Sequence, residues 1–117
     1  MWGKKSLDNF AFPRERWAQL TFEEQMGNIG AEVGRAIIAH QNKNEIRKNR
    51  AIDRAIDLFS ATVDVTLATP AAYRLKEVMR ARDEFLRLFF DGTYENDAPN
   101  INRYFMNFAF LAREKTR

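Results

Sequence analysis

The sequence contains no cysteine, one histidine, three prolines and five glycines. Without cysteine there is no disulfide frame, no thiolate metal site and no cysteine nucleophile, which excludes a disulfide-stapled secreted mini-protein. No apolar run approaches the roughly 20 residues that span a bilayer, and Lys4 and Lys5 are not followed by the apolar segment of a signal peptide. We therefore expect a cytoplasmic protein with no membrane partner.

The composition is that of one globular domain. The 117 residues are 45% hydrophobic, 30% charged and 13% aromatic, which suffices for one core but not for two domains. The net charge of +3 permits an anionic partner without requiring one. No catalytic or ligand-binding motif of high specificity is present, so the sequence predicts the fold in more detail than the function.

Two long helices are predicted first, because apolar residues recur at spacings of three and four. The first begins after Thr21, which can form a capping box with Glu24, and ends near His40. The second covers about 45–67. Its predicted apolar face consists of Ile52, Ile56, Phe59, Val63 and Leu67.

Two further helices are predicted after this point. Proline is tolerated at the first helical position, so Thr69 caps a third helix that begins at Pro70 and stops at Gly92. After a loop at 93–99, a shorter fourth helix covers about 100–113. Four amphipathic helices with short connections predict an all-α fold, an antiparallel up-down-up-down four-helix bundle that occupies 21–117 as a single domain.

The first twenty residues are too aromatic for a disordered tail, yet they lack the sustained period of a long helix. They include Trp2, Phe10, Phe12 and Trp17. We expect residues 1–20 to form an aromatic N-terminal arm packed on the bundle. Phe110 lies off the main apolar face of the fourth helix, so this helix can also contact the arm or another subunit, and we expect a homo-oligomer.

Small residues gather on one side of the first helix. Gly27, Gly30, Ala31 and Gly34 share a face, although each helical glycine costs about 1 kcal/mol relative to alanine. Close approach of another helix, in the same subunit or in a neighbour, is the simplest explanation. A glycine-rich phosphate loop requires a preceding strand and a Lys-Ser/Thr signature, and the sequence has neither.

Arg35 and His40 have an Arg-x4-His spacing. It resembles the signature of the HEPN ribonuclease superfamily, whose members are helical bundles. The resemblance implies that His40 transfers a proton and that Arg35 stabilises an anionic RNA phosphate, the residues of two subunits converging. In the structural alternative, which we favour, His40 is a polar residue at a helix end and Arg35 pairs with a carboxylate such as Glu32.

A basic face is predicted on the second helix. Spacings of four, three and four residues place Lys43, Arg47, Arg50 and Arg54 on one side, and Lys48 broadens it. Such a face is the footprint of a protein that binds phosphate backbones with low sequence specificity, and Lys76, Arg80 and Arg87 of the third helix could extend it. The alternative is a solvated surface, because Asp53 and Asp57 are interspersed.

No metal site and no cofactor are predicted. Ferritin-like bundles hold metals with Glu-x-x-His pairs that project inward. The one histidine of this chain does not follow a glutamate at that spacing. Catalytic residues are predicted only in the ribonuclease alternative with Arg35 and His40.

Segments spread over most of the chain carry a broader resemblance, namely 20–25, 27–36, 55–59, 74–77 and 104–113. Together they resemble a family of small uncharacterised bacterial proteins. These are similar in size and architecture to a four-helix-bundle group that includes the accessory variability determinant of diversity-generating retroelements and the proteins encoded in ribosomal RNA intervening sequences. The accessory determinant is a basic pentameric barrel that binds nucleic acid and a reverse transcriptase. The resemblance implies an RNA or DNA partner for the basic face and an oligomer contact for the glycine face.

We therefore expect a non-catalytic accessory or adaptor protein that binds nucleic acid through backbone phosphates, with a protein such as a reverse transcriptase as a further partner. Two alternatives stay open at this point. One is a HEPN-like ribonuclease that uses Arg35 and His40. The other is a protein-interaction bundle whose partner contacts the arm or the fourth helix.

Overall fold

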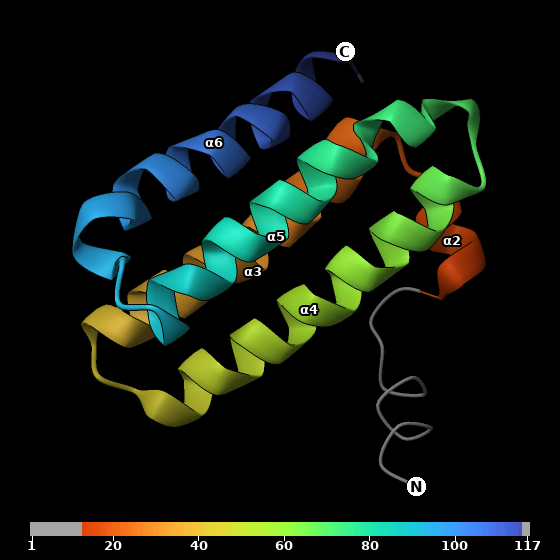
Figure 1. The fold of residues 1–117 in the computed structure, drawn as a ribbon. Coiled ribbons are helices and arrows are strands. Elements are labelled where there is room, and N and C mark those ends of the chain that lie inside the picture. The colour runs from red at the N-terminus through yellow and green to blue at the C-terminus, as the bar shows by residue number, and fades with distance from the viewer. Residues whose placement is uncertain (1–12, 116–117) are drawn as a thin grey trace, which may run out of the picture.

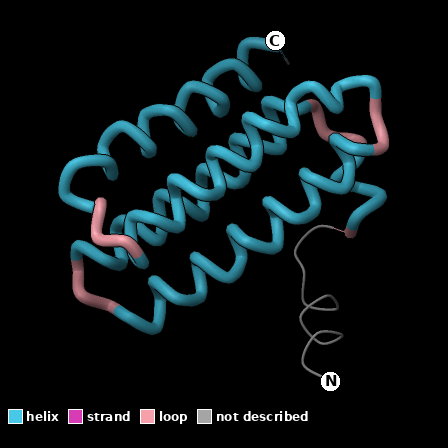
Figure 2. The backbone as a smooth tube through the Cα atoms, viewed as in Figure 1, coloured by secondary structure: helices cyan, strands magenta, loops and turns pink. Residues whose placement is uncertain are grey.

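The structure, a computed structural model, describes residues 13–115. Nearly all of these residues are helical, and no strand occurs among them (Figures 1 and 2). The elements are α2 (Arg14–Ala18), α3 (Phe22–Gln41), α4 (Glu45–Leu67), the 3-10 helix η1 (Pro70–Arg74), α5 (Leu75–Phe90) and α6 (Tyr94–Lys115). The predicted all-α class is confirmed. None of the described helices is long and apolar enough to cross a lipid bilayer.

The first two long helices have the bounds that the sequence predicts. At the start of α3, the Thr21 hydroxyl accepts from the Glu24 amide (3.1 Å) and the Thr21 amide donates to the Glu24 carboxylate (2.8 Å), so the predicted capping box is confirmed. At the start of α4, the Asn44 side chain accepts from the Arg47 amide (3.1 Å). Lys43 turns the chain between the helices with a φ of 56°.

The third helix begins later than predicted. Pro70 opens the 3-10 helix η1, and the α-helix starts at Leu75. The Thr69 hydroxyl donates to the Thr66 carbonyl (3.1 Å) at the end of α4. The Thr66 carbonyl also accepts from the Thr69 amide (3.3 Å), so Thr69 closes the end of α4 with both its backbone and its side chain.

The prediction of a loop at 93–99 was wrong, because α6 begins at Tyr94 and carries Pro99 inside its second turn. Tertiary contacts hold this turn in the helix against the local preference of proline. The Tyr94 hydroxyl donates to the Ile37 carbonyl on α3 (3.3 Å), and Ala98 is buried in the core. The Asp97 amide also donates to the Thr93 carbonyl (3.0 Å).

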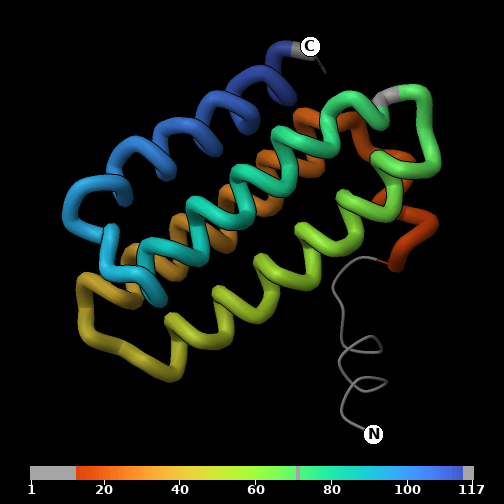
Figure 3. Tube along the Cα trace, viewed as in Figure 1, coloured from red at the N-terminus to blue at the C-terminus, as the bar shows by residue number. Residues whose placement is uncertain are grey.

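The long helices surround one core. α3 packs against α4 and α6, and α5 packs against the same two helices. The path of the chain through these helices can be followed in Figure 3. Phe59 of α4 lies at the centre, its ring centroid 6.3 Å from that of Phe85 on α5 and 6.1 Å from that of Phe105 on α6. All three rings are fully or almost fully buried.

The apolar face of α4 was predicted wrongly at its C-terminal end, where Leu67 is exposed. Ile52 and Phe59 are buried as predicted, and so is Leu58, but small residues make up the rest of the buried face: Ala51, Ala55, Ala61, Thr62 and Thr66. Small side chains admit close helix packing. The buried face is therefore rotated away from the line that the large apolar residues suggest.

Residues 1–12 of the expected arm, with Trp2, Phe10 and Phe12, lie outside the described residues. The rest of the arm contains α2, which packs against α4. Trp17 is fully buried, and its indole N–H donates to the Thr62 hydroxyl (2.9 Å). Its carbonyl accepts from the Gln25 side chain (3.0 Å). This one tryptophan thus connects α2 to both α3 and α4.

A pH-dependent contact joins α5 and α6, where the Tyr104 hydroxyl donates to the Glu77 carboxylate (2.8 Å). Burial, and then this hydrogen bond, raise the pKa of Tyr104 well above its ordinary value of 10.0. The folded chain therefore holds the phenol proton more tightly than the unfolded chain does. The resulting stabilisation is complete below about pH 10 and is lost as the pH rises toward the folded-state pKa.

We expect wild-type protein to lose more stability than Tyr104→Phe between about pH 9 and about pH 11, because only the wild type carries this phenol proton. Urea unfolding at each pH, followed by circular dichroism, measures the difference. Parallel stability curves for the two proteins would show that Tyr104 has the same pKa in both states.

Candidate functional site

The basic side of α4 faces the edge that α4 shares with α3. Arg54 marks this direction, because its Nε lies 2.9 Å from Oε1 of Glu32 on α3. Arg47 and Arg50 share the side of α4 with Arg54 through spacings of three and four residues. Both are exposed, and no described residue forms an ion pair with either side chain in the structure.

Arg35 of α3 joins the same edge, because its Nη1 lies 3.0 Å from the second carboxylate oxygen of Glu32. The Glu32 side chain is only 13% exposed, whereas those of Arg35 and Arg54 are 60% and 49% exposed. One nearly buried carboxylate therefore holds two guanidinium groups at the surface. The pairing of Arg35 with Glu32 was predicted from the sequence, but the pairing of Arg54 with Glu32 was not.

We call this surface the arginine edge, consisting of Arg35, Arg47, Arg50 and Arg54. Glu32 contacts two of its members, Arg35 and Arg54. Asp53 is exposed on α4 but points about 100° around the helix axis from Arg54. Asp57 is half-buried and lies on the arginine side, three residues from Arg54 and seven from Arg50, so the four arginines face two carboxylates, Glu32 and Asp57. The edge thus carries more positive than negative charge, the arrangement that attracts a polyanion.

Two lysines of the predicted basic face lie elsewhere. Lys48 pairs with Glu45 (2.9 Å), and its Nζ lies 5.7 Å from the ring centroid of Phe89 on α5. It therefore lies on the opposite flank of α4 and does not broaden the edge. Lys43 is exposed in the turn before α4 rather than on the helix itself.

The predicted extension onto α5 is not continuous with the arginine edge. Arg87 pairs with Asp91 (3.7 Å). Lys76 and Arg80 are exposed on α5, which packs against α4, whereas Arg54 points from α4 toward α3. These cations form a separate surface.

Arg35 and His40 point in different directions. Five residues of helix separate them, a rotation of about 140°. His40 is half-buried, with its ring centroid 4.1 Å from that of Tyr94 and 5.5 Å from that of Phe89. Its Nδ1 atom is buried without a hydrogen-bond partner in the structure. Within one chain the two side chains do not converge on a common point, and Arg35 forms the pair with Glu32 that the structural alternative predicts.

The glycines of α3 permit a close approach of α6. A Cβ atom at Gly30 would lie 2.7 Å from Cβ of Phe105, and one at Gly27 would lie 3.3 Å from Cα of Ala109. Gly34 has more room, since its nearest neighbour would be Oδ1 of Asn102 at 3.8 Å. Ala31 is exposed and is not part of this contact. The helix that approaches the glycines is in the same subunit.

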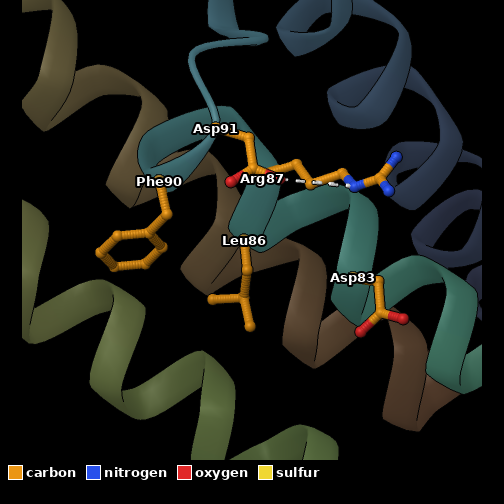
Figure 4. Close-up of a pocket in the computed structure, with 5 residues that line it drawn as sticks. All are labelled: Asp83, Leu86, Arg87, Phe90 and Asp91. Carbon is orange, nitrogen blue, oxygen red and sulfur yellow. Dashed lines mark ion pairs between the residues drawn. The ribbon is translucent and has the colours of Figure 1, made fainter.

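An open depression of about 310 Å³ lies on the outer side of α5 and is lined by Asp83, Leu86, Arg87, Phe90 and Asp91 (Figure 4). All five residues come from the last turns of one helix and the position after it, and Arg87 and Asp91 neutralise each other. A site that binds small molecules needs polar groups converging from several elements, so this depression is not our candidate. No group of three potential metal ligands occurs within 13–115.

Comparison of the chain with protein-family models gave no match, and comparisons with curated proteins and with solved structures gave none either.

Proposed function

We propose that this chain is a non-catalytic accessory protein that binds nucleic acid through backbone phosphates along the arginine edge. The observation that carries the proposal is the edge between two helices where Glu32 pairs with exposed Arg35 and Arg54, while Arg47 and Arg50 lie exposed on the same side of α4 as Arg54. Guanidinium groups match phosphate geometry and stay charged at all physiological pH values. A reverse transcriptase or another protein as a second partner is part of the same proposal.

The proposed scaffold is an antiparallel up-down-up-down four-helix bundle with the arm packed on it. Each long helix contacts two others, and the connections at 42–44 and 91–93 are three residues long. Connections this short favour antiparallel neighbours. The alternating course of α3, α4, α5 and α6 in Figure 1 supports the same arrangement.

The proposed contacts position nucleic acid without specifying a sequence. The three arginines of α4 cover about 10 Å along the helix axis, which suits a few successive phosphates. The edge has no aromatic side chain for base stacking and no recognition helix that could enter a groove, so binding should depend on salt more than on sequence.

The test is a titration of labelled single-stranded and duplex RNA and DNA with purified protein, read by fluorescence anisotropy over about 50 to 200 mM salt. We expect affinity to fall steeply with salt. The double variant Arg47→Glu/Arg50→Glu should bind at least about tenfold more weakly, with the salt slope reduced by about two, because each arginine contributes about one phosphate contact.

The matched control is Lys76→Glu/Arg80→Glu, which changes the net charge by the same amount at exposed positions of α5. We expect it to keep most of the affinity. Equal losses for the two double variants would show that only the overall charge matters, and absence of binding at about 50 mM salt would overturn the proposal.

A variant with the opposite effect sharpens this test. Glu32→Gln removes the negative charge between Arg35 and Arg54 while it keeps an amide oxygen that can accept from them. We expect tighter nucleic-acid binding by severalfold. A loss of affinity with the fold intact would mean that Glu32 is needed to position the arginines rather than opposing their charge.

A further inference from the structure

Two large apolar side chains are exposed where α4 begins and α5 ends. Ile46 is exposed to 67% and Phe90 to 69%. The Nζ atom of Lys48 lies 5.7 Å from the ring centroid of Phe89, so these two helix ends are neighbours. In Figure 4, Phe90 lies on the side of α5 that faces α4. We call Ile46 and Phe90 the apolar end of the α4–α5 pair.

The outer side of α4 leads from the apolar end back toward the start of the described chain. Asp53 and Asp64 share this side with Ile46, because spacings of seven and eleven residues are close to whole numbers of helical turns. Asp64 pairs with Arg14 of α2 (2.8 Å). Asp53 is exposed, and no described residue forms an ion pair with it. This side of α4 therefore has both an apolar end and an available carboxylate.

The other charged side chains around Asp53 balance one another. Arg82 and Asp83 of α5 pair with each other (3.3 Å). Arg50 and Asp57, one cation and one carboxylate, flank Asp53 on the side of the arginine edge. Asp53 is therefore the carboxylate left to attract a cationic segment.

The described chain begins beside this side of α4. Arg14, which contacts Asp64, is the first residue of α2. Twelve residues precede Pro13, and an extended segment of that length reaches about 40 Å. From Asp64 back to the apolar end, the axis of α4 measures about 27 Å. Residues 1–12 can therefore reach the apolar end, whereas only three residues of α4 follow Asp64 in the other direction.

The chemistry of residues 1–12 matches this side of α4. Their large apolar side chains are those of Trp2, Leu7, Phe10 and Phe12, and Lys4 and Lys5 outnumber the single carboxylate of Asp8. In an extended segment, Trp2 lies about 7 to 10 Å from the two lysines. Along α4, Asp53 lies about 10 Å from Ile46. A segment with its tryptophan at the apolar end thus places its lysines beside Asp53.

We propose that residues 1–12 dock along the outer side of α4, with Trp2 covering the apolar end and the two lysines beside Asp53. The exposed apolar side chains are then withdrawn from water. The lysines supply the cations that Asp53 lacks among the described residues. The arginine edge, on the side of α4 toward α3, would repel the same segment and stays open. The docking does not require nucleic acid.

The test is acrylamide quenching of Trp2 fluorescence in the whole chain without nucleic acid. The chain has two tryptophans, and subtracting the emission of Trp2→Phe protein separates Trp2 from the buried Trp17. We expect Trp2 to be quenched severalfold less than free N-acetyltryptophanamide. Phe90→Glu should remove this protection with unchanged circular dichroism, because Phe90 is exposed and its substitution leaves the core intact.

The matched control is Phe110→Glu, which places the same charge at a position exposed to 57% on α6. This variant should keep Trp2 protected. A Trp2 that is fully accessible in the wild type, or that Phe110→Glu releases while Phe90→Glu does not, would overturn the proposal. Protection that disappears on dilution would overturn it as well, because the segment of a second copy would then cover the apolar end.

A charge exchange tests where the lysines lie. Asp53→Lys should increase the quenching of Trp2, because the new cation repels Lys4 and Lys5. Adding Lys4→Glu/Lys5→Glu to Asp53→Lys should restore the protection. Quenching that Asp53→Lys leaves unchanged would show that the lysines lie elsewhere, and the proposed placement of the segment would fail.

Discussion

Trp17→Ala is expected to lower the free energy of unfolding by about 3–5 kcal/mol, the range for removal of a large buried aromatic side chain. Trp17 is completely buried between α2, α3 and α4, and it is the only fully buried residue of α2. The substitution removes the indole from the core and leaves the Thr62 hydroxyl without its donor. Since domains of this size are stable by about 5–15 kcal/mol, much of the total is lost. Urea unfolding followed by circular dichroism measures the loss.

Two comparisons separate packing from hydrogen bonding at this site. Trp17→Phe keeps a ring but removes the N–H, and Thr62→Val keeps the shape but removes the acceptor; each should cost about 1–3 kcal/mol. The double variant should cost less than the two losses together, because neither polar group is then left unpaired. Tyr73→Ala, at a position exposed to 76%, should change stability by less than about 0.5 kcal/mol. A similarly small effect of Trp17→Ala would mean that α2 is undocked in solution.

Local chemistry made α3 and α4 predictable. The capping box of Thr21 and Glu24 acts within four residues, and the polar turn before Glu45 separates two strongly periodic segments. The same reasoning failed at Pro99, because the contacts that keep the start of α6 helical come from Ile37, which is 57 residues from Tyr94 in sequence. Sequence patterns report local preference, and tertiary packing overrides that preference where enough surface is buried.

The candidate site was predictable in part for the same reason. The periodicity of α4 put Arg47, Arg50 and Arg54 on one side, and the structure keeps them together. The participation of Glu32 in holding Arg54 depends on the register of α3 against α4, which links residues 22 positions apart. This relation leaves no signal in the spacing of residues along one helix. The position of Lys48 does leave one, because a residue next to Arg47 points about 100° away from it, off the side that the three arginines share.

Alanine substitutions at the three glycines of α3 are expected to have graded effects that change sign. Gly30→Ala should destabilise the protein by about 1–3 kcal/mol, because its Cβ would overlap the first side-chain carbon of Phe105, which can move only with the backbone of α6. Gly34→Ala should stabilise it by about 0.5–1 kcal/mol, because its Cβ meets only an ordinary contact and alanine favours the helix. Gly27→Ala, with its Cβ 3.3 Å from the backbone of Ala109, should fall between them.

The order of these three variants tests the α3–α6 contact itself, since helix propensity alone would make all three substitutions stabilising by a similar amount. Urea unfolding of the three variants gives the comparison. Their midpoints can be compared directly if the free energy of unfolding falls with urea concentration at the same slope in each, because an equal slope shows that the folded and unfolded states are otherwise unchanged. If Gly30→Ala proved as stabilising as Gly34→Ala, α6 would not approach α3 as closely as the structure describes. The small residues of α3 would then be available to a neighbouring subunit rather than to α6.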